Sequence, residues 1–136
     1  VSNLYFLLRG VSMRIVEQNG VIITITDPTD RIDSIEDALD FMASAMFRYD
    51  SGAIVFHSDC LHRDFFDLKT RFAGEVLQKF SNYNIRLAIV GDFRRYPGQA
   101  LKDFIYECNQ GQHIFWVDSI EDALNLLAPN TYPIDL

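Results

Sequence analysis

A short polar loop near the middle of the chain carries the residue types most often used for metal binding and nucleophilic catalysis. His57, Cys60 and His62 lie close together in this loop. Imidazole and thiolate are ligands that zinc prefers, and a Cys–His pair can also activate a thiol nucleophile. The spacing supplies only three ligands, no partner cluster exists elsewhere, and nothing marks an oxyanion hole. We therefore predict no metal site and interpret the segment as a solvated loop.

Glycines and paired carboxylates give no stronger indication of catalysis. Gly91-Asp92-Phe93 follows a predicted strand, but no G-x-G-x-x-G or Walker pattern occurs in the chain. Glu36-Asp37 and Glu121-Asp122 fall in first helical turns, where acidic side chains stabilise the positive end of the helix dipole. We assign no catalytic residue and no cofactor, and we favour a non-catalytic role without settling whether the chain is an enzyme.

A charged stretch at the entry to the second predicted helix is the candidate binding surface. Asp67, Lys69, Thr70 and Arg71 form a polar group there, although Asp67 has the alternative role of a charge that stabilises the helix N-terminus. Phe66 stands one residue off the apolar stripe of the helix, so it is either a second core contact or an exposed anchor. Exposed aromatic residues beside charges are typical of protein interfaces, which favours a protein partner.

The hydrophobic periodicity predicts the elements that position these residues. Strands at 14–17 and 21–25 flank Asn19-Gly20, a strong hairpin turn signal. Apolar runs that are typical of buried parallel strands, and stripes that are typical of helices, alternate after the hairpin. The strands are expected at 53–56, 85–90 and 114–117, and the helices at 35–46, 65–80, 101–108 and 120–127. This order predicts an α/β fold of doubly wound type, with a mostly parallel five-stranded sheet covered by four helices.

Length and composition bound the class of protein. A chain of 136 residues with 49% hydrophobic residues suits a single domain, which we place at 13–128 with a C-terminal tail at 129–136. Residues 1–12 are interpreted as an N-terminal extension, either upstream sequence or an expression remnant, that contributes little to the fold. The formal charge of −7 disfavours nucleic-acid binding. Two cysteines without a disulfide framework, and no apolar run of the ~20 residues that cross a bilayer, predict a cytoplasmic location without membrane insertion.

Four long motifs stand out at 65–70, 73–83, 87–93 and 103–109, which read FFDLKT, AGEVLQKFSNY, LAIVGDF and DFIYECN. They resemble a bacterial family that is described only as a domain of unknown function, DUF4180. The resemblance extends over nearly everything from Met13 to about Leu127. It implies no particular activity.

The order of elements is also similar to that of STAS domains, the sulfate-transporter and anti-sigma-factor-antagonist domains. Those domains place a regulatory serine in a pattern of apolar residue, Asp, Ser, Ser or Thr, and Gly. Phe66-Asp67 matches the first two positions, but the phosphoacceptor position falls on Leu68. The resemblance therefore implies a STAS-like fold without the switch serine, and it leaves Thr70 as the phosphorylation candidate through a shifted register.

Two functions follow as hypotheses. The first is a non-catalytic regulatory or protein-binding module of STAS type, which acts on a protein partner or through homo-oligomers. The second is a small-ligand-binding or enzymatic domain that uses the loop 57–67.

Overall fold

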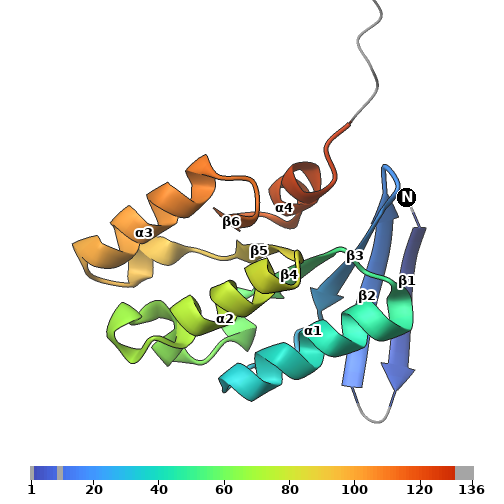
Figure 1. Ribbon diagram of the computed structural model, residues 1–136, viewed down its shortest axis with the longest axis horizontal. Helices are drawn as coiled ribbons and strands as arrows, with labels where there is room; N and C mark the ends of the chain where they lie inside the picture. Colours follow the sequence, from blue (N-terminus) through green and yellow to red (C-terminus); the bar gives the residue numbers. More distant parts are fainter. Residues whose placement is uncertain (1, 9–10, 131–136) are drawn as a thin grey trace, which may run out of the picture.

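A single six-stranded sheet organises the computed structural model, which describes residues 2–8 and 11–130 and places side chains from Arg14 to Asn130 (Figure 1). The strands are β1 (Ser2–Leu8), β2 (Val11–Gln18), β3 (Val21–Thr26), β4 (Ala53–His57), β5 (Arg86–Val90) and β6 (Ile114–Val117). They lie in the sheet in chain order. β1, β2 and β3 form an antiparallel meander, and β3 to β6 are parallel to one another. The predicted mostly parallel α/β sheet that begins with a hairpin is thus confirmed.

The five predicted strands correspond to β2–β6, and β1 is an additional strand. β1 pairs with β2 along its whole length, and β2 itself begins at Val11. The segment that we interpreted as an extension, 1–12, therefore includes one strand and the start of the next. Its small contribution to the fold stays a prediction, and removing it would leave the rest of β2 as the edge of the sheet.

Four helices connect or follow the parallel strands: α1 (Ile35–Tyr49), α2 (Phe72–Asn82), α3 (Gln99–Gln110) and α4 (Ile120–Leu127). Each step from β3 to β6 moves one strand in the same direction, so right-handed crossovers place α1, α2 and α3 on one face of the sheet. α4 packs on the opposite face. The predicted doubly wound type is wrong in this respect, because a doubly wound sheet reverses its strand order and this one does not. The sheet consequently lacks the crevice that such a reversal opens at the carboxyl ends of strands.

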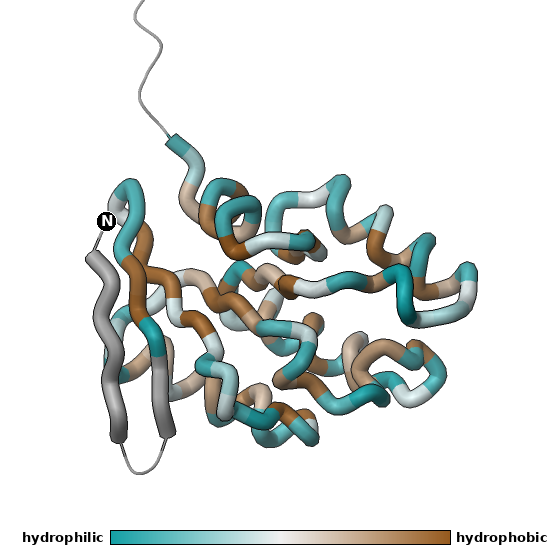
Figure 2. Tube along the Cα trace, turned by 180° about the vertical axis from the view of Figure 1, so that it is seen from behind, coloured by the Kyte–Doolittle hydropathy of each residue, from teal (hydrophilic) through white to brown (hydrophobic). Residues whose placement is uncertain are grey.

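Alternation along the strands divides the core into two layers. One set of side chains packs under α1–α3 and includes Ile54, Phe56, Leu87, Ile89 and Trp116. The other set packs under α4 and includes Ile23, Val55, Ala88, Val90 and Phe115. Figure 2 shows the hydrophobic residues concentrated along the central strands, whereas hydrophilic residues are frequent in the turns. Burial on both faces explains why these strands read as continuous apolar runs in the sequence.

The repeated Asp-Ser-Ile-Glu-Asp-Ala-Leu string marks two helix N-termini. The Ser34 hydroxyl accepts the Asp37 backbone N–H at 3.1 Å, and the Ser119 hydroxyl accepts the Asp122 N–H at the same distance. The acidic residues of these first turns lie at the positive ends of α1 and α4. The repeat is therefore explained by helix capping.

The second helix begins later than the sequence predicts. α2 starts at Phe72, and the preceding residues form two 3₁₀ turns, Arg63–Phe66 and Leu68–Thr70. The Asp67 side chain accepts the Lys69 backbone N–H at 3.2 Å, a local bond that competes with helix formation. Arg71 then adopts the left-handed conformation, with φ of 66°, which interrupts any helix. The predicted start at residue 65 is therefore wrong, because the helix begins only at Phe72, after these two turns.

The outer edge of β6 is closed by one side chain. Asn109, on α3, accepts the Trp116 backbone N–H at 2.8 Å and donates to the Trp116 carbonyl at 3.0 Å. The amide thus occupies the backbone N–H and C=O of Trp116, with which a further strand would pair. Such covering suppresses association through an exposed sheet edge.

Asn109→Ala is expected to lower the free energy of unfolding by about 1–2 kcal/mol, because two hydrogen bonds to the backbone are lost at once. It should also promote self-association through β6. Urea denaturation and sedimentation velocity measure the two effects. Gln110→Ala, on the neighbouring exposed residue, is the control and should change stability by less than about 0.5 kcal/mol. Equal stabilities of the two variants would contradict the role of Asn109.

No helix among the described residues combines the length and the apolar character needed to span a membrane.

Candidate functional site

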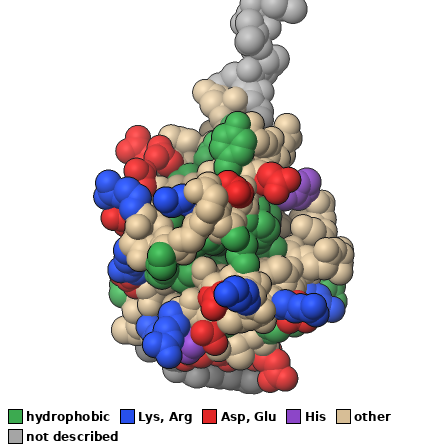
Figure 3. All heavy atoms as spheres, turned by 90° about the vertical axis from the view of Figure 1, so that its left-hand side faces the viewer, with side chains coloured by type: hydrophobic (Ala, Val, Ile, Leu, Met, Phe, Trp, Pro, Cys, Tyr) green, Lys and Arg blue, Asp and Glu red, His purple; other side chains and the backbone are tan. Residues whose placement is uncertain are grey.

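The loops that leave the carboxyl ends of β4 and β5 contain the candidate binding residues. The first loop runs through the 3₁₀ turns to α2, and the second runs through a 3₁₀ turn at Phe93–Arg95 to α3. Figure 3 shows the molecule with this end toward the viewer. Apolar side chains show through its centre, and acidic and basic side chains are interspersed around them. This surface is where the sequence places its candidate site.

The Cys–His loop is tied to its own surroundings rather than to a common centre. The Thr26 hydroxyl accepts the His57 backbone N–H and lies 2.9 Å from His57 Nδ1. Cys60 is buried, its Sγ donates to the Asp27 carbonyl at 3.4 Å, and burial raises the pKa of its thiol. His62 Nδ1 accepts the Asp64 backbone N–H instead. A buried thiol with a raised pKa is a poor nucleophile, so this geometry does not form a Cys–His pair.

Within the part of the chain that the structure describes, no three His, Cys, Asp or Glu side chains form a group that could hold a metal ion.

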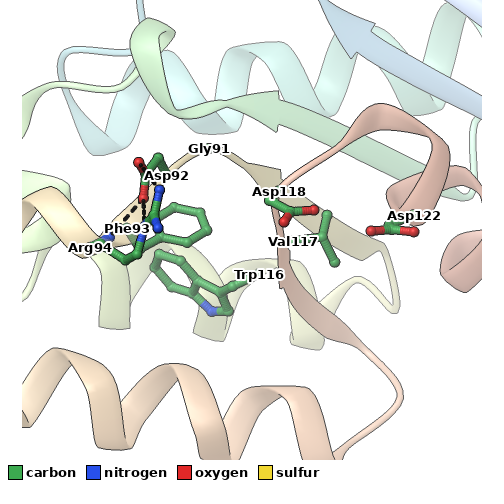
Figure 4. Close-up of a pocket in the computed structure, with 8 residues that line it drawn as sticks. All are labelled: Gly91, Asp92, Phe93, Arg94, Trp116, Val117, Asp118 and Asp122. Carbon is green, nitrogen blue, oxygen red and sulfur yellow. Dashed lines mark hydrogen bonds and ion pairs between the residues drawn. The ribbon is translucent and has the colours of Figure 1, made fainter.

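An open hollow of about 630 Å³ lies between the ends of β5 and β6 (Figure 4). Phe93 and Trp116 form its aromatic wall, with ring centroids 5.2 Å apart. Arg94 folds back on Asp92, whereas Asp118 lies across the hollow from them. The indole nitrogen of Trp116 points away from these carboxylates. The hollow is thus acidic, and its single arginine is already paired.

The Asp92–Arg94 pair lowers the pKa of one carboxyl group in this hollow. Arg94 Nε and Nη2 donate to the two Asp92 carboxylate oxygens at 2.9 Å each, and this bidentate contact lowers the pKa of Asp92 from 3.8 to about 2. Because folding lowers the pKa of Asp92, any stabilisation from the pair is present at pH values above the ordinary pKa of 3.8 and is lost as the pH falls through about 2.

Carboxyl NMR titration should place the midpoint of Asp92 near pH 2, and Arg94→Ala should raise this midpoint. A wild-type midpoint that Arg94→Ala leaves unchanged would contradict the pairing.

A second hollow, of about 410 Å³, contains part of the predicted binding surface. We call it the Lys69 groove. The loop after β4 contributes Arg63, Phe66, Asp67, Leu68 and Lys69, and the start of α3 forms the other side through Tyr96, Pro97, Gly98, Ala100 and Leu101. The groove therefore lies between two loops that follow neighbouring strands.

A stack of side chains fixes the two sides of the Lys69 groove to each other. The Phe66 and Tyr96 rings are stacked 4.1 Å apart and only 9° from parallel. The Arg95 guanidinium lies 5.2 Å from the centre of the Tyr96 ring and is bound to Asp59 at 2.9 Å. Aromatic pairs and cation–π contacts each contribute about 0.5–1.5 kcal/mol. The groove is thus held in shape without a ligand.

Phe66 is a core residue and not an exposed anchor. Its side chain is only 5% exposed and also contacts the rings of Phe65 and Trp116. The structure therefore favours the first of the two alternatives that the sequence left open. The edge of Phe66 that remains accessible forms the floor of the Lys69 groove.

The other predicted residues have separate positions. Asp67 and Lys69 line the Lys69 groove. Arg71 lines a third hollow, of about 340 Å³, which we call the Gly74 hollow and which is formed by Leu68, Arg71, Gly74, Glu75 and Phe104. Leu68 borders both hollows, so they adjoin. Thr70 lines neither hollow, and its hydroxyl donates to the Asp64 and Asp67 carbonyls at 2.7 and 2.8 Å.

Three basic side chains around these hollows are unpaired. Arg63, Lys69 and Arg71 have no ion pair and no side-chain hydrogen bond with any residue from Arg14 to Asn130. The arginines of the β5 loop, by contrast, are both engaged with carboxylates. The three free cations are therefore available to a ligand.

Sequence reasoning missed the α3 side of the groove. Tyr96 and Gly98 face the loop 63–69 across it, although they lie far from that loop in the sequence. Pro97-Gly98 precedes the predicted helix at 101–108, and such a pair indicates only a turn. The sequence contains no local signal for this contact, because the two loops are adjacent only through the pairing of β4 with β5 in the sheet.

The chain folds as an α/β domain with a groove at the carboxyl edge of its sheet. The sequence profile of the domain of unknown function DUF4180 matches residues 17–127, so the chain belongs to that family. No curated protein and no solved structure matches the chain. The resemblance to DUF4180 is thereby confirmed, whereas the resemblance to STAS domains stays a prediction.

Proposed function

We propose that this domain is a non-catalytic, cytoplasmic protein-binding module of regulatory type, in the manner of a STAS domain, and that it binds its partner through the Lys69 groove. The observation that supports this most is the set of three unpaired basic side chains, Arg63, Lys69 and Arg71, beside a groove held in shape by the Phe66–Tyr96 stack. Preorganised grooves bind with less loss of side-chain entropy. Two free cysteines suit a reducing compartment.

Site-specific cross-linking tests the proposal. A photo-cross-linking residue at position 69 should form adducts with a protein partner, or with a second copy of the chain, in cells of the source organism. The same residue at Lys79, in the last turn of α2, is the matched control and should form none of these adducts. Identical adducts from both positions, or none from position 69, would contradict the proposal.

Thr70 enters the proposal as a regulatory phosphorylation site. Phosphorylation would add a charge of about −1.5 to −2 next to Lys69 and Arg71, and it would remove the proton that the hydroxyl donates to the loop carbonyls. The added charge would neutralise these two basic side chains and so weaken binding of any partner that pairs with them. Thr70→Glu should therefore reduce cross-linking from position 69, whereas Thr70→Ser should leave it unchanged.

A small anionic ligand at the same place is the second candidate function. The volume of the Lys69 groove lies within the range of small-molecule sites, and the first turn of α3 carries neither an acidic residue nor a side-chain cap. Uncapped helix N-termini attract anions. A melting screen with inorganic phosphate and small carboxylates separates the candidates, because a rise in Tm that saturates with concentration and disappears in Lys69→Glu would favour the small ligand.

A further inference from the structure

We propose that the partner presents an acidic segment with one large apolar side chain, whose carboxylates lie in the Lys69 groove while the apolar side chain inserts into the Gly74 hollow. This inference rests on the proposed function and specifies the chemistry of the partner. It treats the two adjoining hollows as one continuous docking surface, joined at Leu68.

Charge complementarity supports the acidic part. The chain as a whole has a formal charge of −7, yet the two hollows are bordered by three unpaired basic residues against Asp67 and Glu75. The helix dipole gives the N-terminus of α3 a partial positive charge, and no acidic residue of the first turn offsets it, in contrast to α1 and α4. An acidic segment would thus be attracted to this surface and repelled by most of the remaining protein.

The Gly74 hollow supports the apolar part. Leu68 and Phe104 form its apolar walls and are only partly buried. Gly74, on α2, lines the same hollow, and a Cβ atom at this position would meet no atom within 4 Å. Space bordered by incompletely buried apolar side chains gains free energy when a further apolar group fills it.

The packing of α3 points to the same surface. Leu101 is its only fully buried residue among twelve, while Phe104, Ile105 and Cys108 are partly covered. The other helices over this face of the sheet bury four or five residues each. An apolar side chain between α2 and α3 would complete the burial of Phe104. This is the arrangement expected where a partner supplies part of the core.

Peptide titration tests the inference on the full chain. The probe is a short peptide with glutamates on both sides of one leucine, and Trp116 is the reporter. Trp116 is the single tryptophan, and it contacts the rings of both Phe66 and Phe104. The peptide should change Trp116 fluorescence with saturation. Replacing its glutamates by lysines, or its leucine by serine, should weaken binding at least about tenfold. Equal binding of the lysine peptide would overturn the inference.

Two pairs of variants locate the peptide. Gly74→Met fills the hollow and should weaken the glutamate–leucine peptide at least about tenfold, with no decrease in Tm, because a helical glycine is replaced by a better helix former. Gly74→Ala adds only one carbon: it should raise the free energy of unfolding by about 0.5–1 kcal/mol and weaken binding less than Gly74→Met does. Lys69→Glu should weaken binding, while Lys79→Glu, with the same change of charge, should not. Binding that survives Gly74→Met or Lys69→Glu would overturn the assignment.

The outcomes separate this inference from the proposed function. If position 69 cross-links a protein in cells but the glutamate–leucine peptide does not bind, the acidic–apolar assignment is wrong and the protein-binding role stands. If position 69 cross-links nothing, the proposed function fails, whichever peptide binds.

Discussion

Phe66→Ala should lower the free energy of unfolding by about 3–5 kcal/mol, the cost of deleting a buried phenylalanine. Phe66 is 5% exposed, stacks on Tyr96 and lies against the ring of Trp116. Removing it leaves a cavity between the two loops that carry the Lys69 groove, and the stack that holds these loops together is lost. Chemical denaturation followed by far-UV circular dichroism measures the change without relying on Trp116.

Two milder variants provide the controls. Phe66→Leu retains apolar volume but not the stack, so its loss of stability should be clearly smaller. Tyr96→Phe keeps the ring and removes only the hydroxyl that accepts from Arg95 at 3.1 Å, so its stability should stay within about 1 kcal/mol of the wild type. A loss below about 1 kcal/mol for Phe66→Ala would show that Phe66 is not the core residue described above.

The regular elements were predictable because their signals are local. The apolar runs of β4, β5 and β6 follow from burial on both faces, and the serine caps of α1 and α4 follow from spacing alone. The start of α2 was not predictable from the apolar stripe, since Phe65 and Leu68 continue the helical period while lying in 3₁₀ turns. Local bonds from Asp67 and Thr70 override the periodicity there.

The candidate site was predictable only on one side. Phe66, Asp67 and Lys69 were identified from an unusual charged stretch next to an aromatic residue, and they do line one groove. Whether Phe66 was buried depended on Tyr96, which reaches it from the loop after β5. The strand order, which runs in one direction without a switch point, also depends on pairing between distant segments. Neither property has a signature within a short window of sequence.

Gly91→Ala should destabilise the domain by about 3 kcal/mol, at the upper end of the usual cost of overpacking. Gly91 follows β5, and its backbone N–H donates to the Val117 carbonyl at 2.9 Å, so the chain is held in place at this point. A Cβ atom at position 91 would lie 2.6 Å from the Cβ of Ser58 and would also collide with the Ser58 hydroxyl. Ser58 is buried at the end of β4, and neither loop can move without disturbing the two neighbouring strands.

A double-mutant cycle identifies the cause of this effect. Ser58→Gly removes both colliding atoms, so Gly91→Ala should cost much less in that background than in the wild type. The coupling free energy between the two positions should therefore be large, on the order of 1–3 kcal/mol. Ser58→Ala removes the hydroxyl but keeps the Cβ, and it should rescue Gly91→Ala only in part. Additive effects of Gly91→Ala and Ser58→Gly would mean that the glycine is required for a reason other than the close approach of the β4 and β5 loops.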